Sequence, residues 1–113
     1  MYEKDKLNLL SIQEASTKII TYSKGYESAD SLFENQRDFD AIMMNFIVIG
    51  EMVSRLSNEF FERYSSIEWA KIRGFRNFIA HNYFGIDAEE VWDIIKSHLP
   101  DFMFDIDKIL KEI

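Results

Sequence analysis

Apolar residues recur along this chain with helical spacing, and no stretch of useful length alternates apolar and polar residues as a half-buried strand does. A first helix is predicted over about residues 4–22, with a break in the segment SKGYESAD, where Gly25 is the natural stop. Ser28 or Asp30 can cap a short helical turn that continues through Phe33. The stripe of the first helix that should face the core contains Leu9, Ile12 and Ile19.

A second long helix is predicted over about residues 36–61, because its apolar residues alternate at spacings of four and three. This seam consists of Ile42, Phe46, Ile49, Val53, Leu56 and Phe60. A second stripe consists of Met44, Val48 and Met52. A helix that is apolar on more than one side needs more than one partner surface. One side should face the core, and the other favours a homodimer interface, although a central helix buried within a monomer gives the same pattern.

Two capping signals mark later helices. Ser65, with Glu68 three residues on, fits a capping box and predicts a third helix through about Ala80. Asp87 repeats this logic at the start of a fourth helix, which Pro100 should kink or split after residue 98 or 99. The buried face of the fourth helix should contain Val91, Ile94, Ile95, Phe102, Ile106 and Ile109. Helices joined by short loops predict an all-α antiparallel bundle of four main helices and a short one.

The composition is that of a folded protein, with 47% hydrophobic residues and only 4 Gly and 1 Pro, and residues 1–113 form one predicted domain. The absence of cysteine excludes disulfides, thiolate catalysis and cysteine-based zinc sites, and it fits a reducing compartment. No leader-like apolar run is visible, and the most apolar window, residues 41–49, is too short to cross a bilayer. We therefore expect a soluble, cytoplasmic protein.

The charge is unevenly distributed. A formal net charge of −7 argues against a general nucleic-acid binder, because phosphate binding rests mainly on Lys and Arg. Residues 68–83, however, carry three basic side chains and one acidic one, a balance of 3 − 1 = +2; they are Lys71, Arg73, Arg76 and Glu68. A local basic island on an acidic protein is therefore the place to look for chemistry.

The third predicted helix separates its apolar and polar residues onto two faces at about 100° per residue. The apolar face carries Ile72, Phe75, Phe78 and Ile79. The opposite face carries Arg73, Arg76, Asn77, Ala80 and His81. Lys71 on the apolar side and Trp69 on the polar side are the exceptions. Two guanidinium groups, a carboxamide and an imidazole are thus expected to project together from one helix.

Arg76, followed by His81 after four residues and by Tyr83 two further on, resembles the Arg-x4-His-x-Tyr signature of the HEPN superfamily. The string WAKIRGFRNFIAHNYFGID resembles the HepT-type toxins in particular, as do FIVIGEMVSRL and EEVWDIIKSHLPDF, so the similarity covers nearly the whole chain. The resemblance implies a helical bundle that dimerises and brings two Arg/His sets into one cleft. It also implies metal-independent RNA cleavage by the ribose 2′-hydroxyl, giving a 2′,3′-cyclic phosphate and a 5′-hydroxyl.

The residue types suit that reaction. Imidazole changes charge near neutral pH, so His81 can take the 2′-hydroxyl proton or protonate the leaving oxygen. Arg76 stays charged and offers a planar fork of donors to phosphate oxygens. Asn77 can orient His81 or the phosphate, and Arg73 either contacts the RNA backbone or is a solvated charge.

The resemblance also implies a partner. HepT toxins are accompanied by an MNT-type nucleotidyltransferase antitoxin that transfers AMP to the motif tyrosine, which is Tyr83 here. Without the resemblance, Tyr83 reads as an aromatic residue packed at a helix end.

Other interpretations stay open at this stage. An Arg and a His near a helix C-terminus are often structural, because cations there interact favourably with the helix dipole. The main alternative function is a catalytically silent helical module that binds a nucleotidyltransferase, and a plain scaffolding dimer is a further one. Glu51 can pair with Arg73 or Arg76, or be exposed, and His98 is expected to be a partly exposed helix residue.

The sequence does not predict a cofactor. Glycine-rich phosphate loops are absent, which argues against a P-loop. Asp38 and Asp40 stand two residues apart on a helix and therefore point apart, and no His lies near them in sequence. The pattern favours neither a metal site nor nucleotide transfer by the chain itself.

Overall fold

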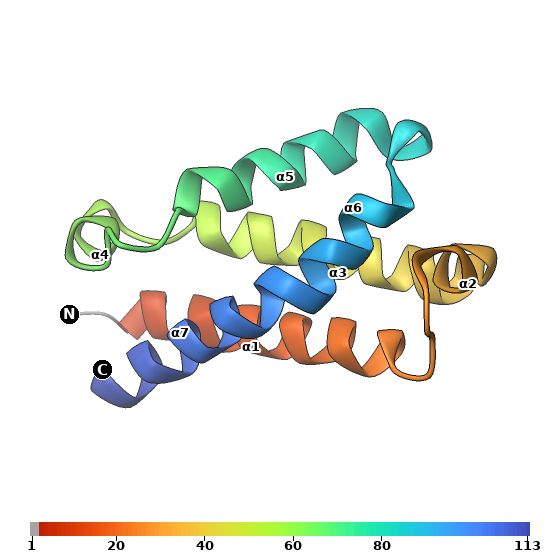
Figure 1. Cartoon of the computed structure of the whole chain (residues 1–113). Coiled ribbons are helices and arrows are strands. Elements are labelled where there is room, and N and C mark those ends of the chain that lie inside the picture. The colour runs from red at the N-terminus through yellow and green to blue at the C-terminus, as the bar shows by residue number, and fades with distance from the viewer. Residues whose placement is uncertain (1–2) are drawn as a thin grey trace.

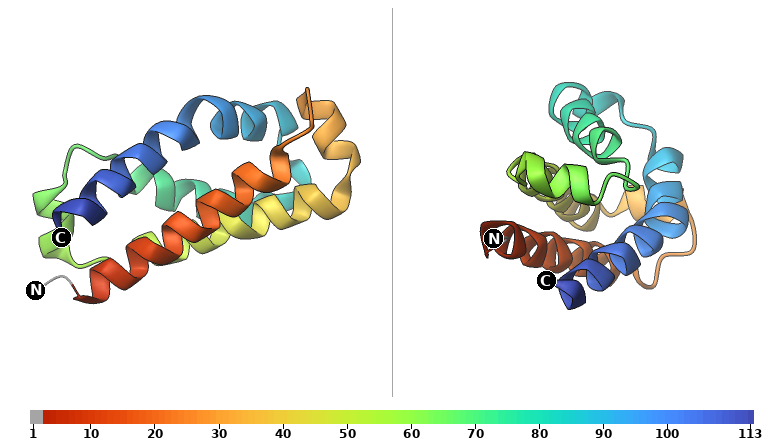
Figure 2. Two further views of the ribbon diagram at one scale, coloured as in Figure 1. Left: turned by 90° about the horizontal axis from the view of Figure 1, so that it is seen from below. Right: turned by 90° about the vertical axis from the view of Figure 1, so that its left-hand side faces the viewer.

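The computed structural model describes residues 3–113, and every regular element in that range is helical, which confirms the all-α prediction. The elements are α1 (Glu3–Ser23), α2 (Ala29–Glu34), α3 (Gln36–Ser54), α4 (Asn58–Arg63), α5 (Trp69–Asn82), η1 (Tyr83–Gly85), α6 (Ala88–Asp93), η2 (Ile94–His98) and α7 (Leu99–Glu112). Helix α3 packs against α1 on one side and α5 on the other, while α7 packs against α1 (Figure 1). The long helices α1, α3 and α5 alternate in direction (Figures 1 and 2).

The first connection forms as predicted. Helix α1 ends at Ser23, and Gly25 adopts a φ of 88°, in the left-handed region that glycine enters at little cost. Ser28 caps α2, with its side chain accepting a hydrogen bond from the backbone N–H of Ser31 at 3.2 Å. The turn at Gly25 and the short helix α2 together set α3 alongside α1 in the opposite direction (Figure 1).

The second long helix is shorter than predicted. Helix α3 ends at Ser54, and Ser57 then caps the separate helix α4. The buried carboxylate of Asp5 accepts hydrogen bonds from the backbone N–H of Ser57 at 2.9 Å and from its hydroxyl at 2.7 Å. Because these bonds come from α1, they redirect the chain at a point where the apolar spacing alone predicts a continuous helix. The predicted seam is buried in full all the same, and its last residues, Leu56 and Phe60, reach the core from beyond the break.

The predicted capping box at the start of the third helix is wrong. Helix α5 begins at Trp69, with Glu68 as its N-cap residue and no side-chain capping bond. The placing of Trp69 on the polar face is wrong as well: its ring is buried against Phe60, and its indole N–H donates to the carbonyl of Tyr64 at 3.0 Å. Burial of this large ring, rather than a serine cap, therefore sets where α5 begins.

The C-terminal helix is divided in the region predicted from Pro100. Asp87 caps α6 as expected, accepting from the backbone N–H of Glu89 at 2.9 Å. The π-helical turn η2 follows α6, and the N–H of Leu99 donates to the carbonyl of Ile94, five residues back. Because Pro100 has no N–H, it cannot donate to the carbonyl of Lys96, which favours such a departure from α-helical bonding. A bend of the helix axis at this point stays a prediction.

The core is built around α3. Its seam packs against apolar residues of α1, the C-terminal helices and α5, including the completely buried Ile12 and Val91 and the nearly buried Ile79. The second predicted stripe is not fully buried: Met44 is 59% exposed, and Val48 and Met52 are half-buried. Helix α3 therefore keeps an apolar edge at the surface. Within residues 3–113 no helix is long and apolar enough to span a bilayer.

Candidate functional site

The site is organised by a close approach of α3 and α5. Gly50 is buried in α3, and a Cβ atom at this position would overlap the Cβ and Cγ atoms of Arg76. Glycine is therefore required for space here, not for an unusual backbone angle. The absent side chain lets the stem of Arg76 lie directly on the backbone of α3.

The guanidinium of Arg76 is held by two acceptors. Its Nη2 forms an ion pair and hydrogen bond with Oε1 of Glu51, and its Nη1 donates to Oδ1 of Asn77 at 2.7 Å. Its Nε is buried and has no hydrogen-bond partner in the part of the chain that the structure describes. The side chains of Arg76 and Glu51 are 36% and 34% exposed, so the pair lies at the edge of the helix seam, neither buried nor fully in water.

His81 lies in the last turn of α5 and is exposed. Five helical residues after Arg76, it is rotated by about 140° from that residue, because each residue turns the helix by about 100°. The two side chains consequently point in different directions: that of Arg76 lies against α3, and that of His81 is exposed to solvent. Among residues 3–113 no hydrogen bond or ion pair joins His81 to Arg76, so within one chain the structure brings Arg76, Asn77 and Glu51 together but not His81.

The other basic residues of the island have structural partners. The guanidinium of exposed Arg73 lies 5.2 Å from the ring centroid of Phe61, in cation–π contact. Lys71 forms an exposed ion pair with Glu68 at 3.4 Å. His98 is exposed, as expected, and its Nε2 lies 3.4 Å from a carboxylate oxygen of Asp93. Of these basic side chains, Arg76 is the one anchored against α3.

Tyr83 follows α5 in the short turn η1, and its hydroxyl donates to a carboxylate oxygen of Asp40. Burial raises the pKa of Tyr83 to about 12, with the hydrogen bond to Asp40 and the negative charge of that carboxylate as the further causes. Its neighbour Phe84 is fully exposed, and the two rings meet edge to face at 5.6 Å. The motif thus ends with one aromatic side chain anchored on α3 and one in water.

Asp40 is the residue of this site that the sequence did not indicate. Asp40 and Glu51 are 51 − 40 = 11 residues apart on α3, about 20° from the same angular position, because 11 steps of about 100° are close to three full turns. One stripe of α3 therefore holds both ends of the motif, with the exposed Met44 between them. The spacing of three turns between Asp40 and Glu51 was the signal in the sequence that could have placed Asp40 at this site. Asp38 points elsewhere, accepting a hydrogen bond from the hydroxyl of Tyr26.

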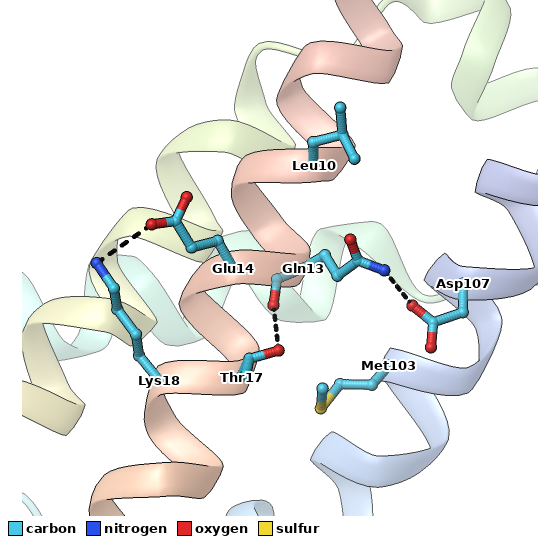
Figure 3. Close-up of a pocket in the computed structure, with 7 residues that line it drawn as sticks. All are labelled: Leu10, Gln13, Glu14, Thr17, Lys18, Met103 and Asp107. Carbon is cyan, nitrogen blue, oxygen red and sulfur yellow. Dashed lines mark hydrogen bonds and ion pairs between the residues drawn. The ribbon is translucent and has the colours of Figure 1, made fainter.

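Two hollows of the surface are lined by neither Arg76, His81 nor Tyr83. One, of about 520 Å³, opens between α1 and α7, where Gln13 donates to Asp107 at 2.5 Å (Figure 3). Another, of about 530 Å³, lies between the apolar face of α5 and the C-terminal helices, over Phe46, Phe75 and Phe102. The polar face with Arg76 and His81 is instead an open surface in the single chain.

A family model described as "Ribonuclease HepT-like" matches residues 12–109. The chain belongs to the HepT-like ribonuclease family. This places it among the HEPN-type proteins, as the Arg-x4-His-x-Tyr motif predicted. Among solved structures, none matches this HepT-like chain.

Curated relatives carry ribonuclease names. A Methanocaldococcus jannaschii protein named "Gamma-glutamylcyclotransferase and putative RNase" is 31% identical over 108 residues, which are 96% of the HepT-like chain but 48% of that protein. Another protein of this organism, named "Putative RNase", is 31% identical over 108 residues, 96% and 88% of the two chains. "Probable ribonuclease HepT" of Thermococcus cleftensis is 26% identical over 100 residues, 88% and 90% of the two chains. These names support an RNase activity in general.

The close approach at Gly50 predicts a contrast between two glycines. Gly50→Ala should destabilise the fold by about 1–3 kcal/mol, because the added methyl group forces α3 and Arg76 apart. The matched control is Gly74→Ala on α5, where a Cβ meets nothing within 4 Å. That change should stabilise the protein by about 0.5–1 kcal/mol, the usual gain for replacing a helix-interior glycine. Urea unfolding of both variants measures the difference, and equal effects of the two would contradict the proposed contact.

The hydrogen bond to Asp40 predicts how Tyr83 titrates. Asp40→Asn should lower the pKa of Tyr83 from about 12 toward 10.0 without reaching it, because burial is the larger cause and remains. Since the folded-state pKa is raised, the contribution of protonated Tyr83 to stability is fully present below about pH 10 and is lost as the pH rises through about 12. The measurement is the phenolate absorbance of each protein minus that of the same background carrying Tyr83→Phe. A titration unchanged by Asp40→Asn would rule the contact out.

Proposed function

We propose that this protein is a metal-independent endoribonuclease of the HepT toxin type, with Arg76 and His81 as its catalytic residues. The observation that carries the proposal is the guanidinium of Arg76, held in place by acceptors from two helices on the same polar face as an unanchored imidazole. Transesterification of a phosphodiester requires both an oriented cation and a group that can exchange protons.

The reaction needs one proton removed and one supplied. His81 takes the proton of the ribose 2′-hydroxyl, whose oxygen attacks the adjacent phosphorus. The bond from phosphorus to the 5′-oxygen breaks, and that oxygen receives a proton from an imidazolium. The products are a 2′,3′-cyclic phosphate and a 5′-hydroxyl. Arg76 stabilises the negative charge that grows on the non-bridging phosphate oxygens.

A homodimer would complete this site. In one chain, His81 does not contact Arg76, and the polar face is open to water, which weakens electrostatic stabilisation. Exposed apolar side chains border this face: Met44 is 59% exposed, Phe78 41% and Phe84 fully. A second copy seated on them would exclude water and supply a second His81, so that one imidazole acts as base and the other as acid.

The proposed control is a covalent one. An MNT-type nucleotidyltransferase antitoxin transfers AMP to Tyr83: the phenolic oxygen attacks the α-phosphorus of ATP, pyrophosphate leaves, and the phenolic proton goes to a carboxylate. Asp40 already accepts a hydrogen bond from that hydroxyl and is placed to receive the proton. The attached nucleotide would put a phosphate two residues from His81, where it opposes the phosphate of an RNA substrate by charge and bulk.

The alternative is a non-catalytic module that binds a nucleotidyltransferase and presents Tyr83. The anchored position of Tyr83 fits this alternative equally well. The orientation of Arg76 distinguishes the ribonuclease from this alternative, because a module that only presents Tyr83 to a nucleotidyltransferase has no need of an oriented guanidinium.

Purified protein should cleave single-stranded RNA in the presence of EDTA and leave 2′,3′-cyclic phosphate ends. His81→Ala and Arg76→Ala should each lower the rate by at least about 100-fold, the usual contribution of a general base or an oriented charge. End-group analysis by mass spectrometry and circular dichroism of each variant are the measurements. Cleavage that persists in folded His81→Ala, or that needs a divalent metal, would exclude this mechanism.

AMP-modified protein should be inactive toward the same RNA, whereas Tyr83→Phe should keep its activity and acquire no added mass. The test co-expresses the chain with an MNT-type nucleotidyltransferase and records intact masses and RNA cleavage. Modified protein that cuts RNA at the unmodified rate would end the proposal of covalent control while leaving the ribonuclease proposal standing.

A further inference from the structure

We propose that Glu51 is a positioning residue of this site, which fixes the guanidinium of Arg76 in the orientation that the reaction uses. The inference rests on the proposed ribonuclease function and deepens it. Its basis is the packing of α3 against α5, in which two adjacent residues of α3 contact Arg76. Gly50 leaves space for the Cβ and Cγ atoms of Arg76, and Glu51 forms an ion pair with its guanidinium.

Three contacts restrict the side chain of Arg76, one at its aliphatic part and two at its guanidinium. Gly50 lies against Cβ and Cγ of Arg76, Oε1 of Glu51 binds Nη2, and Oδ1 of Asn77 binds Nη1. A guanidinium has five N–H bonds. Glu51 and Asn77 each take one, and the bond at the buried Nε is turned away from water, so 5 − 2 − 1 = 2 remain, one on each terminal nitrogen. Arg76 thus keeps a pair of donors for the oxygens of a phosphate.

A purely structural role explains this arrangement less well. Partly exposed ion pairs contribute little to stability. The seam between α3 and α5 is already closed by apolar contacts, since the rings of Phe46 and Phe75 meet edge to face at 5.2 Å and Ile79 is buried. An arginine that only joined two helices would not need its Nε buried without a partner, which costs free energy.

The carboxylate also reduces the attraction of Arg76 for anions. Glu51 should therefore favour turnover through orientation rather than through tighter binding of RNA, and its removal should act on kcat more than on KM. The opposite role, in which Glu51 competes with RNA phosphate for Arg76, predicts lower KM and unchanged or higher kcat when Glu51 is removed.

The kinetic test compares Glu51→Ala with Glu51→Gln on a fluorescent single-stranded RNA. Glu51→Ala should lose about 10- to 100-fold in kcat, the scale of effect that misplaced groups produce, with KM changed by less than about threefold. Glu51→Gln keeps an acceptor oxygen and should recover most of that loss. The matched controls are Glu14→Ala and Glu14→Gln, which alter the exposed pair of Glu14 with Lys18 on α1 and should change nothing. Equal losses in the two Glu51 variants, or a higher kcat in either, would overturn the assignment.

A second readout does not depend on activity. In nitrogen-15 spectra of the arginine side chains, Arg76 of the wild type and of Glu51→Gln should show separate, slowly exchanging Nη signals, because rotation about the guanidinium bonds is restricted. In Glu51→Ala these signals should merge. If the wild type cuts no RNA but the spectra behave as described, the proposed function fails and the positioning contact stands. If the Arg76 signals are already merged in an active wild type, the positioning role fails and the ribonuclease stands.

Discussion

The close approach of α3 and α5 at Gly50 is the constraint on which the rest of the site depends. Packed helices ordinarily lie 8–10 Å apart, at a distance set by the side chains between them. Gly50 contributes none, so the stem of Arg76 rests on the backbone of α3 and Glu51, the next residue, reaches its guanidinium. Three turns earlier on the same stripe, Asp40 reaches Tyr83. One face of α3 thereby sets the positions of both ends of the motif carried by α5 and η1.

This arrangement also explains how an acidic protein presents a cation. With a net charge of −7, the chain would oppose the approach of RNA at most of its surface. Two carboxylates at the site are instead engaged in holding the motif residues: Glu51 forms an ion pair with Arg76, and Asp40 accepts a hydrogen bond from Tyr83. In the proposed function, local binding of phosphate would depend on the donors that Arg76 keeps free, while the acidic surface elsewhere would suppress nonspecific attraction of nucleic acid. Orientation, rather than an excess of positive charge, is what the structure provides.

The sequence predicted the parts of this structure that depend on local signals. The apolar seam of α3, the glycine stop after α1 and the caps at Ser28 and Asp87 were confirmed, because each is encoded within a few neighbouring residues. The errors came from interactions between distant residues. Asp5 redirects the chain at Ser57, 52 residues away, and so ends the helix that apolar spacing extends to residue 61. Burial of the Trp69 ring overrides a serine capping signal. The pairing of Asp40 with Tyr83 joins α3 to η1: the spacing of Asp40 and Glu51 places both on one stripe of α3, but it does not identify Tyr83 as the partner.

The three motif residues differ in how firmly the chain holds them, and the difference bears on mechanism. Arg76 and Tyr83 are both anchored on α3, whereas His81 lies between them in the sequence, and its exposed side chain forms no hydrogen bond or ion pair within the described residues. A group that stabilises charge works best when it is fixed beforehand, since it then needs no reorganisation during the reaction. A group that carries a proton must instead meet the reacting oxygens, whose positions are set by the substrate and by whatever covers the open face. In the proposed reaction the constraint on His81 that one chain lacks would come from outside it, and a second copy, bringing its own anchored arginine to the same phosphate, would supply that constraint with the fewest further assumptions.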